Sequence, residues 1–237
     1  MRLDRYGVVA AARLPRREVR LDHRRVLAVG DDGHRRFAED AVEHLRVVDQ
    51  HVAGGRAHEH LHARRGARIG NLIKCNPAIK DASDREAIIA ALAEDVIDIL
   101  ATDHAPHTLE EKSKPYAQAP SGLPLVQYAL VAALELVHEG KLTTTQVVQK
   151  FAHAPAQLFD VAERGFLREG NFADLVLVDD TPFTVRREDV LSKCAWSPFE
   201  GTTFHSRIAS TWVNGQLAWD GSKLVGEPVG SRLAFAR

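Results

Sequence analysis

Residues 96–107 read VIDILATDHAPH, and this stretch decides the fold class. Its first part, Val96 to Thr102, is mostly apolar and β-branched, a composition typical of a buried strand. The run ends at Asp103, and Pro106 prevents a helical turn from following directly. In parallel α/β folds the carboxyl ends of the strands hold the functional residues. Asp103 is therefore either a functional carboxylate or a residue that caps a turn.

A helix and a second strand are predicted ahead of this run. Asn71 to Cys75 is a short apolar run that ends at an Asn-Pro pair, a natural end of a strand. Ser83 and Glu86 have the spacing of a capping box. Strand, helix and strand within about thirty residues form the parallel βαβ unit, so an α/β fold is expected. The apolar residues on one face of the predicted helix are Ile88, Ile89, Leu92 and Val96.

Two more helices and a small β module are predicted after the polar loop. One helix runs from Pro124 to Gly140, and the next from Thr143 to about His153. From Gly165 the periodicity becomes strand-like, and Asn214-Gly215 is a strong signal for a β-hairpin. The runs with a strand pattern are Ala173 to Val178, Ser206 to Val213 and Gln216 to Trp219.

The first part of the chain differs in composition. Residues 1–73 contain 15 arginines and no lysine, whereas residues 74–237 contain eight of each. We considered two interpretations of residues 1–69: a basic arm that binds nucleic acid, and an out-of-frame or disordered segment that is not native coding sequence. Acidic residues are interleaved throughout and no aromatic platform for bases is visible, so the second interpretation is preferred.

Composition excludes several classes of protein. With 237 residues, 45% of them hydrophobic and 27% charged, the chain is of the globular type, and not collagen, a coiled coil or a disordered tail. A formal net charge of −1 gives no attraction to nucleic acid or acidic membranes, and no apolar stretch is long enough to cross a bilayer. Cys75 and Cys194 are too few for a disulfide scaffold, so buried thiols and a reducing, cytoplasmic compartment are expected.

Five motifs point to a family. They are IKCNPAIK (73–80), ATDHAPHTLEEK (101–112), PSGLPLVQ (120–127), GNFADLVLVD (170–179) and KCAWSPFEG (193–201). In this order, from about residue 70 to the carboxyl terminus, the chain resembles dihydroorotase, a member of the amidohydrolase superfamily. The resemblance implies the last strands and helices of a (β/α)8 barrel over residues 70–163, followed by a small β-sandwich module over residues 164–237.

The resemblance also implies an activity. Dihydroorotases interconvert carbamoyl-aspartate and dihydroorotate, the small-molecule substrates, in pyrimidine synthesis, and they hold zinc at the carboxyl ends of the strands. Asp103 matches the carboxylate that binds zinc and carries a proton between the metal-bound hydroxide and the amide nitrogen. Asn76 and His107 match residues that bind the substrate, and Gly122 lies in a loop that hydrogen-bonds its ring. A second copy of the chain or aspartate carbamoyltransferase is the implied protein partner.

The metal ligands depart from the family pattern. No lysine precedes Lys74, so the family's carboxylated lysine is absent. His60, His62 and Arg64 imitate the family's HxHxR motif but directly precede KCNP, so we do not assign them to a metal site. Weak or no activity is therefore expected of the chain alone. Two alternatives stay open: a hydantoinase- or allantoinase-type amidohydrolase, and a non-catalytic subunit associated with aspartate carbamoyltransferase.

Overall fold

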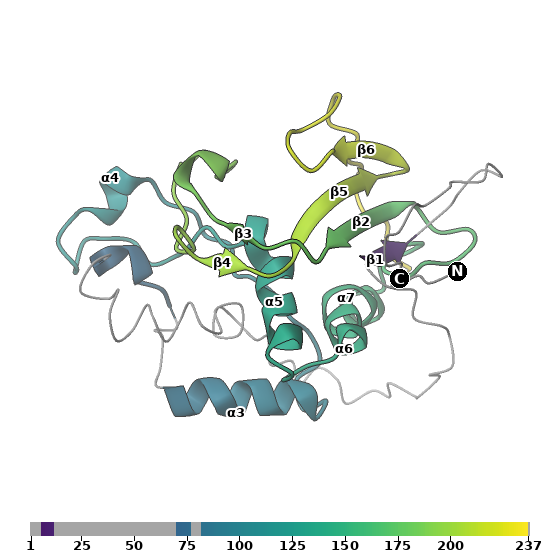
Figure 1. The fold of residues 1–237 in the computed structure, drawn as a ribbon, viewed down its shortest axis with the longest axis horizontal. Coiled ribbons are helices and arrows are strands. Elements are labelled where there is room, and N and C mark those ends of the chain that lie inside the picture. Colours follow the sequence, from purple (N-terminus) through teal and green to yellow (C-terminus); the bar gives the residue numbers. More distant parts are fainter. Residues whose placement is uncertain (1–5, 12–69, 77–81, 237) are drawn as a thin grey trace. The chain divides into compact units, whose positions relative to one another are not determined.

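The computed structural model describes residues 6–11, 70–76 and 82–236. They fall into two compact units (Figure 1), and each is described by itself. The sheet unit contains the described parts of Met1–Leu45, Thr144–Thr181 and Ser206–Arg237, and the loop unit contains those of Arg46–Thr143 and Pro182–His205. The domain boundary expected between residues 163 and 164 stays a prediction. Within the described ranges, no helix has the length and hydrophobicity needed to cross a membrane.

The sheet unit is built on a four-stranded antiparallel sheet, in the order β1-β2-β5-β6 (Figure 1). The strands predicted after residue 172 are confirmed, with bounds that differ by a residue or less. The first strand, β1, was not predicted, and it pairs with β2 so that Val8 faces Leu177. The four strands are β1 (Tyr6–Ala11), β2 (Asp174–Asp179), β5 (Arg207–Val213) and β6 (Gln216–Trp219).

The predicted hairpin between β5 and β6 is confirmed. Val213 pairs with Gln216 across a two-residue turn, in which Asn214 and Gly215 have φ angles of 51° and 78°. Two positive φ angles in succession define the turn type whose twist matches that of antiparallel strands. The adjoining core forms around Leu177, which packs against partly buried hydrophobic side chains of β2 and β5: Leu175, Ala209 and Trp212.

A continuous helical segment lies between β1 and β2 in the chain, directly ahead of β2. It consists of α6 (Thr144–Val148), a π-helical turn at Gln149–His153 and α7 (Ala154–Leu158), so the predicted helix is confirmed and continues further. Pro155 lies in the first turn of α7, directly after the π-helical turn, where its fixed φ suits the helix. His153 is buried and stacks on Phe166 with ring centroids 4.4 Å apart, and burial lowers the pKa of its imidazole.

The loop unit has short elements around an apolar and aromatic core. Leu92 and Leu136 are fully buried, and the ring of Tyr128 lies 6.0 Å from that of Phe199 and 6.2 Å from that of Phe204. The elements of this unit are the 3-10 helices Gly70–Ile73, Val126–Tyr128 and Arg187–Asp189, the helices α3 (Ala82–Ala93), α4 (Leu109–Lys112) and α5 (Ala129–His138), and the strands β3 (Phe183–Thr184) and β4 (Thr203–Phe204).

Two predicted strands of the loop unit are wrong. The segment Asn71 to Cys75 begins in a 3-10 helix, whose turn is closed where Lys74 N donates to Asn71 O over 3.0 Å. Val96 N donates to Ala91 O over 2.9 Å, which closes the end of α3. In the described part of the chain no strand spans residues 96–102. An apolar run becomes a strand only where a neighbouring strand completes its hydrogen bonds.

Helix boundaries also differ from the prediction. Ser83 lies inside α3, so it does not cap that helix, and Glu86 instead pairs with Lys141 over 3.0 Å. A capping box does occur in the structure, at Thr108 and Glu111, where it begins α4. The helix expected from Pro124 begins as a 3-10 turn at Val126–Tyr128 and becomes α-helical at Ala129.

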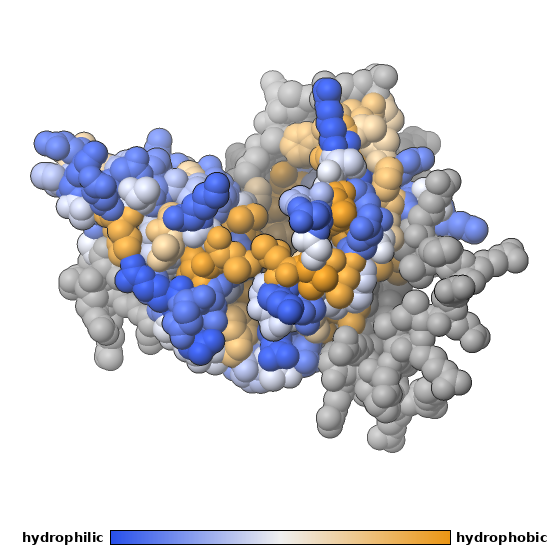
Figure 2. Space-filling view, turned by 90° about the horizontal axis from the view of Figure 1, so that it is seen from above, coloured by the Kyte–Doolittle hydropathy of each residue, from blue (hydrophilic) through white to orange (hydrophobic). Residues whose placement is uncertain are grey.

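Hydrophobic and hydrophilic areas alternate on the surface drawn in Figure 2. Single exposed apolar residues are normal on a folded protein. Val126 and Leu191 differ from the others because both also line a pocket, which is described below. Among the described residues of the loop unit, the exposed large hydrophobic residues are Val96, Tyr116, Val126 and Leu191.

Arg164 stabilises the sheet unit by joining three segments. Its guanidinium pairs with Asp174 of β2 and donates to Asn214 Oδ1 over 2.8 Å and to Ser231 Oγ over 3.1 Å. The Arg164 side chain is only 11% exposed, whereas that of Arg207, 4.0 Å from Asp179, is 47% exposed. A nearly buried ion pair that loses one partner leaves the other charge poorly solvated.

We predict that Arg164→Met lowers the free energy of unfolding by about 2 kcal/mol, because it leaves Asp174 without its cation. The control Arg207→Met also removes one arginine from the sheet unit, and it should change stability by no more than about 0.5 kcal/mol. Urea unfolding followed by tryptophan fluorescence measures both values. Equal losses in the two variants would contradict this account of Arg164.

Candidate active site

Two loops of the loop unit meet at the buried side chain of Lys112. The residue is 1% exposed, and its ammonium donates to Lys74 O over 2.9 Å, to Pro120 O over 3.1 Å and to Gly122 O over 3.1 Å. These three hydrogen bonds use all three donors of the ammonium. Since Lys74 lies two residues before Asn76, the ammonium holds together the loops that contain two predicted substrate-binding residues, Asn76 and Gly122.

The short helix α4 positions Lys112. Thr108 caps the helix: its Oγ1 accepts from Glu111 N over 3.2 Å, and Glu111 Oε2 accepts from Thr108 N over 2.8 Å. The hydrogen bonds from Thr108 hold the pKa of the Glu111 carboxyl below its usual range. His107 directly precedes Thr108, so the cap fixes the backbone between His107 and Lys112. The T-x-x-E pattern from Thr108 to Glu111 is the sequence signal of this capping box.

His107 and Gly122 lie in direct contact. His107 Nε2 lies 3.1 Å from Ser121 O, and because a carbonyl oxygen only accepts, Nε2 carries the proton. Gly122 has φ of +140°, and a Cβ there would lie 2.5 Å from Ala105 O and 3.1 Å from His107 Cδ2. Only glycine fits this position without displacing its neighbours. The indole of Trp196, a residue that the sequence analysis did not single out, donates to His107 O over 2.7 Å.

Asn76 and Asp103 are both exposed. Asn76 lies two residues after Lys74. The carbonyl of Lys74 also accepts from Gly122 N over 3.0 Å, so the chain just ahead of Asn76 lies close to the second loop. Asp103 has φ of +41°, a conformation that costs energy in any residue other than glycine and is often found at functional sites. The place of Asp103 in the site stays a prediction.

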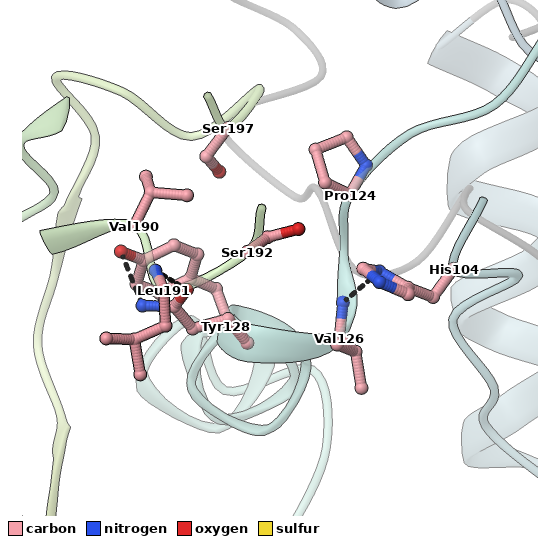
Figure 3. Close-up of a pocket in the computed structure, with 9 residues that line it drawn as sticks. His104, Pro124, Val126, Tyr128, Val190, Leu191, Ser192 and Ser197 are labelled. Atoms are coloured by element: carbon pink, nitrogen blue, oxygen red, sulfur yellow. Dashed lines mark hydrogen bonds between the residues drawn. The ribbon is translucent and has the colours of Figure 1, made fainter. Parts of the chain in front are cut away.

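A pocket of about 370 Å³ opens in the loop unit, next to the loop that contains Gly122. Figure 3 shows His104 and Pro124 at one side of this pocket and Val190 and Leu191 at the other. Gln127 fixes its wall, because its amide accepts from Leu191 N over 2.8 Å and donates to Asp189 O over 2.7 Å. The remaining lining residues are Val126, Gln127, Tyr128, Ser192 and Ser197, and burial raises the pKa of the Tyr128 hydroxyl to about 12.

The described residues do not fit a zinc site by themselves. Nowhere in residues 70–76 and 82–236 do three His, Cys, Asp or Glu side chains stand close enough together to hold a metal ion. His104 Nδ1 accepts from Leu125 N over 3.1 Å and from Val126 N over 3.2 Å, so its lone pair is already used. His60 and His62 lie outside the described residues. Cys75 and Cys194 are buried thiols, as expected.

We predict that Gly122→Ala lowers the free energy of unfolding by about 2 kcal/mol or more and shifts the NMR signals of the His107 ring, because its Cβ would overlap Ala105 O. Gly140 is the matched control, since its φ is also positive at +70° and a Cβ there meets nothing within 4 Å. Gly140→Ala should cost only the conformational penalty of about 1 kcal/mol and leave the His107 signals unchanged. If the two variants behave alike, the close contact at Gly122 is refuted.

The chain is similar in sequence to known dihydroorotases. The chain is 39% identical to a dihydroorotase of Clostridium acetobutylicum over 186 residues, 78% of this chain and 40% of the relative. It is 39% identical to a dihydroorotase of Halobacterium salinarum over 183 residues, 73% of this chain and 43% of the relative. The chain thus spans about two fifths of the length of these relatives.

Solved structures and a family model agree on the fold. An L-hydantoinase of Arthrobacter aurescens superposes with a TM-score of 0.65 at 27% identity, over 68% of this chain and 37% of that one. A dihydropyrimidinase of Brevibacillus agri gives a TM-score of 0.61 at 23% identity, over 66% of this chain and 36% of that one. These likenesses indicate a fold of the TIM-barrel type. The model of the amidohydrolase family matches residues 60–218, which begins ten residues ahead of the expected boundary. The chain belongs to the amidohydrolase family.

Proposed function

We propose that these loops form the substrate-binding side of a dihydroorotase-like cyclic amide hydrolase, which interconverts carbamoyl-aspartate and dihydroorotate. The main support is the Lys112 ammonium, which holds the Asn76 loop and the Gly122 loop together next to His107. The dihydroorotases named above match the same part of the chain. In this proposal residues 70–163 are the last part of the barrel and residues 164–237 the β-sandwich module.

Asn76 and His107 are proposed to bind the carboxylate that both substrates carry. The Asn76 side chain is exposed, and its amide has two N–H donors for a carboxylate. The His107 side chain is 29% exposed beside the same loops, and its Nδ1 lies 3.8 Å from Glu111 Oε2. Gly122 N donates to Lys74 O and Gly122 O accepts from Lys112, so Gly122 is proposed to lie with its loop backbone against the substrate ring.

Asp103 is proposed to move the proton. Opening a cyclic amide requires a base that takes a proton from the attacking water and returns it to the leaving nitrogen. An exposed carboxylate held beside the substrate loops suits this role. The family is generally metal-dependent, and zinc ligation by Asp103 is the matching proposal. Because the described residues supply no ligand set, no step is assigned to the ion, and we expect little or no turnover by the chain alone.

A second candidate is a hydantoinase-type cyclic amide hydrolase. The likeness to the L-hydantoinase structure favours it, because the two folds superpose over two thirds of this chain. Hydantoin lacks the carboxylate of dihydroorotate, so the two candidates differ in what Asn76 and His107 would bind. Two proposals concern protein partners: a non-catalytic role beside aspartate carbamoyltransferase, and a homodimer of this chain.

We predict that carbamoyl-aspartate and dihydroorotate shift the NMR signals of His107 and the Ser121–Gly122 amides, whereas hydantoin does not. Asn76→Ala and His107→Ala should each weaken binding about tenfold, the worth of one hydrogen bond to a carboxylate. His138→Ala, which removes an imidazole from α5 of the same unit, is the control and should bind as the original chain does. Equal responses to hydantoin would favour the second candidate, and no response to any of the three ligands would contradict the proposal.

A further inference from the structure

We propose that Lys112 is a positioning residue for substrate binding, and that its positive charge sets the geometry of the two loops at 73–76 and 120–122. Its ammonium is the shared hydrogen-bond donor of both loops. The identity of the ligand rests on the proposed function, but the geometry of the loops does not. Lys112 therefore has a role that can be measured with or without substrate.

The loops depend on Lys112 because their carbonyl groups turn inward. Lys74 O, Pro120 O and Gly122 O all point to one nitrogen atom, and Lys112 is almost completely buried. A buried carbonyl that loses its donor costs about 1–3 kcal/mol, so these loops would rearrange if the donor were removed. A change at Gly122 would reach His107, because the two residues are in contact.

The nearby Lys74 side chain does not replace Lys112. Lys74 Nζ donates to Tyr116 O and to Ala119 O, each over 2.6 Å, and lies 4.6 Å from the centre of the Tyr116 ring. It therefore fixes the loop ahead of Pro120 and leaves the three inward carbonyls to Lys112. Of the two lysine side chains, it is therefore Lys112 that donates to the carbonyl groups next to the predicted ligand-binding residues.

The Lys112 ammonium loses its proton at a lower pH than an ordinary lysine. Burial lowers the pKa of its ammonium to about 8, and the positive charge of Lys74 acts in the same direction, while the Cys75 thiol opposes it. An ammonium has three donors, but a neutral amine has two and a lone pair. One of the three carbonyls must therefore lose its hydrogen bond from Lys112 when the ammonium is deprotonated.

Local geometry and the contribution of Lys112 to stability should respond to pH in opposite directions. Between pH of about 8 and about 10.5 the unfolded chain binds more protons at this lysine than the folded chain, so the contribution of Lys112 to the free energy of unfolding rises with pH. Over the same range the loops lose a hydrogen bond from Lys112. A lysine without a positioning role would not loosen the Ser121–Gly122 backbone as it loses its proton.

The experiment is an NMR titration of the original chain and two variants from pH of about 6.5 to about 9.5. In the original chain the Lys112 side-chain signals should titrate with a midpoint near 8, and the Ser121 and Gly122 amides and the His107 ring should follow the same midpoint. In Lys112→Met those signals should start displaced, and the shared transition should be absent. The control is Lys141→Met, which removes a lysine that pairs with Glu86 and Glu139 in the same unit; it should leave both features intact.

The inference is overturned if the Ser121 and Gly122 amides do not follow the titration of Lys112, or if Lys112→Met leaves them unshifted. If Lys112→Met does not fold, the titration of the original chain decides alone. Addition of carbamoyl-aspartate gives a separate result: its affinity should fall at least about fivefold as Lys112 loses its proton. If no ligand binds at either pH, the proposed function fails, and the loop signals still decide on Lys112.

Discussion

A buried charge must be hydrogen-bonded, and at Lys112 this requirement determines how the candidate site is built. The lysine lies at the end of α4, a single helical turn begun by the capping box at Thr108 and Glu111. The Lys112 ammonium donates to the carbonyl of Lys74, more than thirty residues earlier in the chain, and to that of Gly122, ten residues later. The local signal of the cap therefore fixes a non-local arrangement, and Gly122 and His107 come into contact as a result.

The sheet unit follows the same principle with a different cation. Arg164 satisfies Asp174 and Asn214 at the end of the hairpin, where strand pairing alone would leave polar groups without partners. Because a guanidinium has donors on a planar fork, it can join segments from several directions. In both units one nearly buried cation links segments that the apolar core does not bring together by itself.

Local signals explain which parts of the fold were predictable. The β5–β6 hairpin was predicted because Asn214-Gly215 and the alternating residues beside it specify the turn and both strands. The strand expected at residues 96–102 was wrong because a strand depends on neighbours that no local pattern reveals. For the site, the family resemblance selected His107 and Gly122, which do lie together. The role of Lys112 could not be predicted, because its three acceptors meet only in the folded chain.

The most direct measurement of the central claim is the nuclear Overhauser effect between the His107 ring and the α-protons of Gly122. His107 Cδ2 lies 3.1 Å from the point where a Cβ would replace one of those protons, so a cross-peak is expected between them and the Hδ2 proton of His107. This cross-peak, together with contacts from the Lys112 side chain to Gly122, is the result that this account predicts. The absence of these cross-peaks in a folded chain would contradict it, because the loops would then not meet at Lys112.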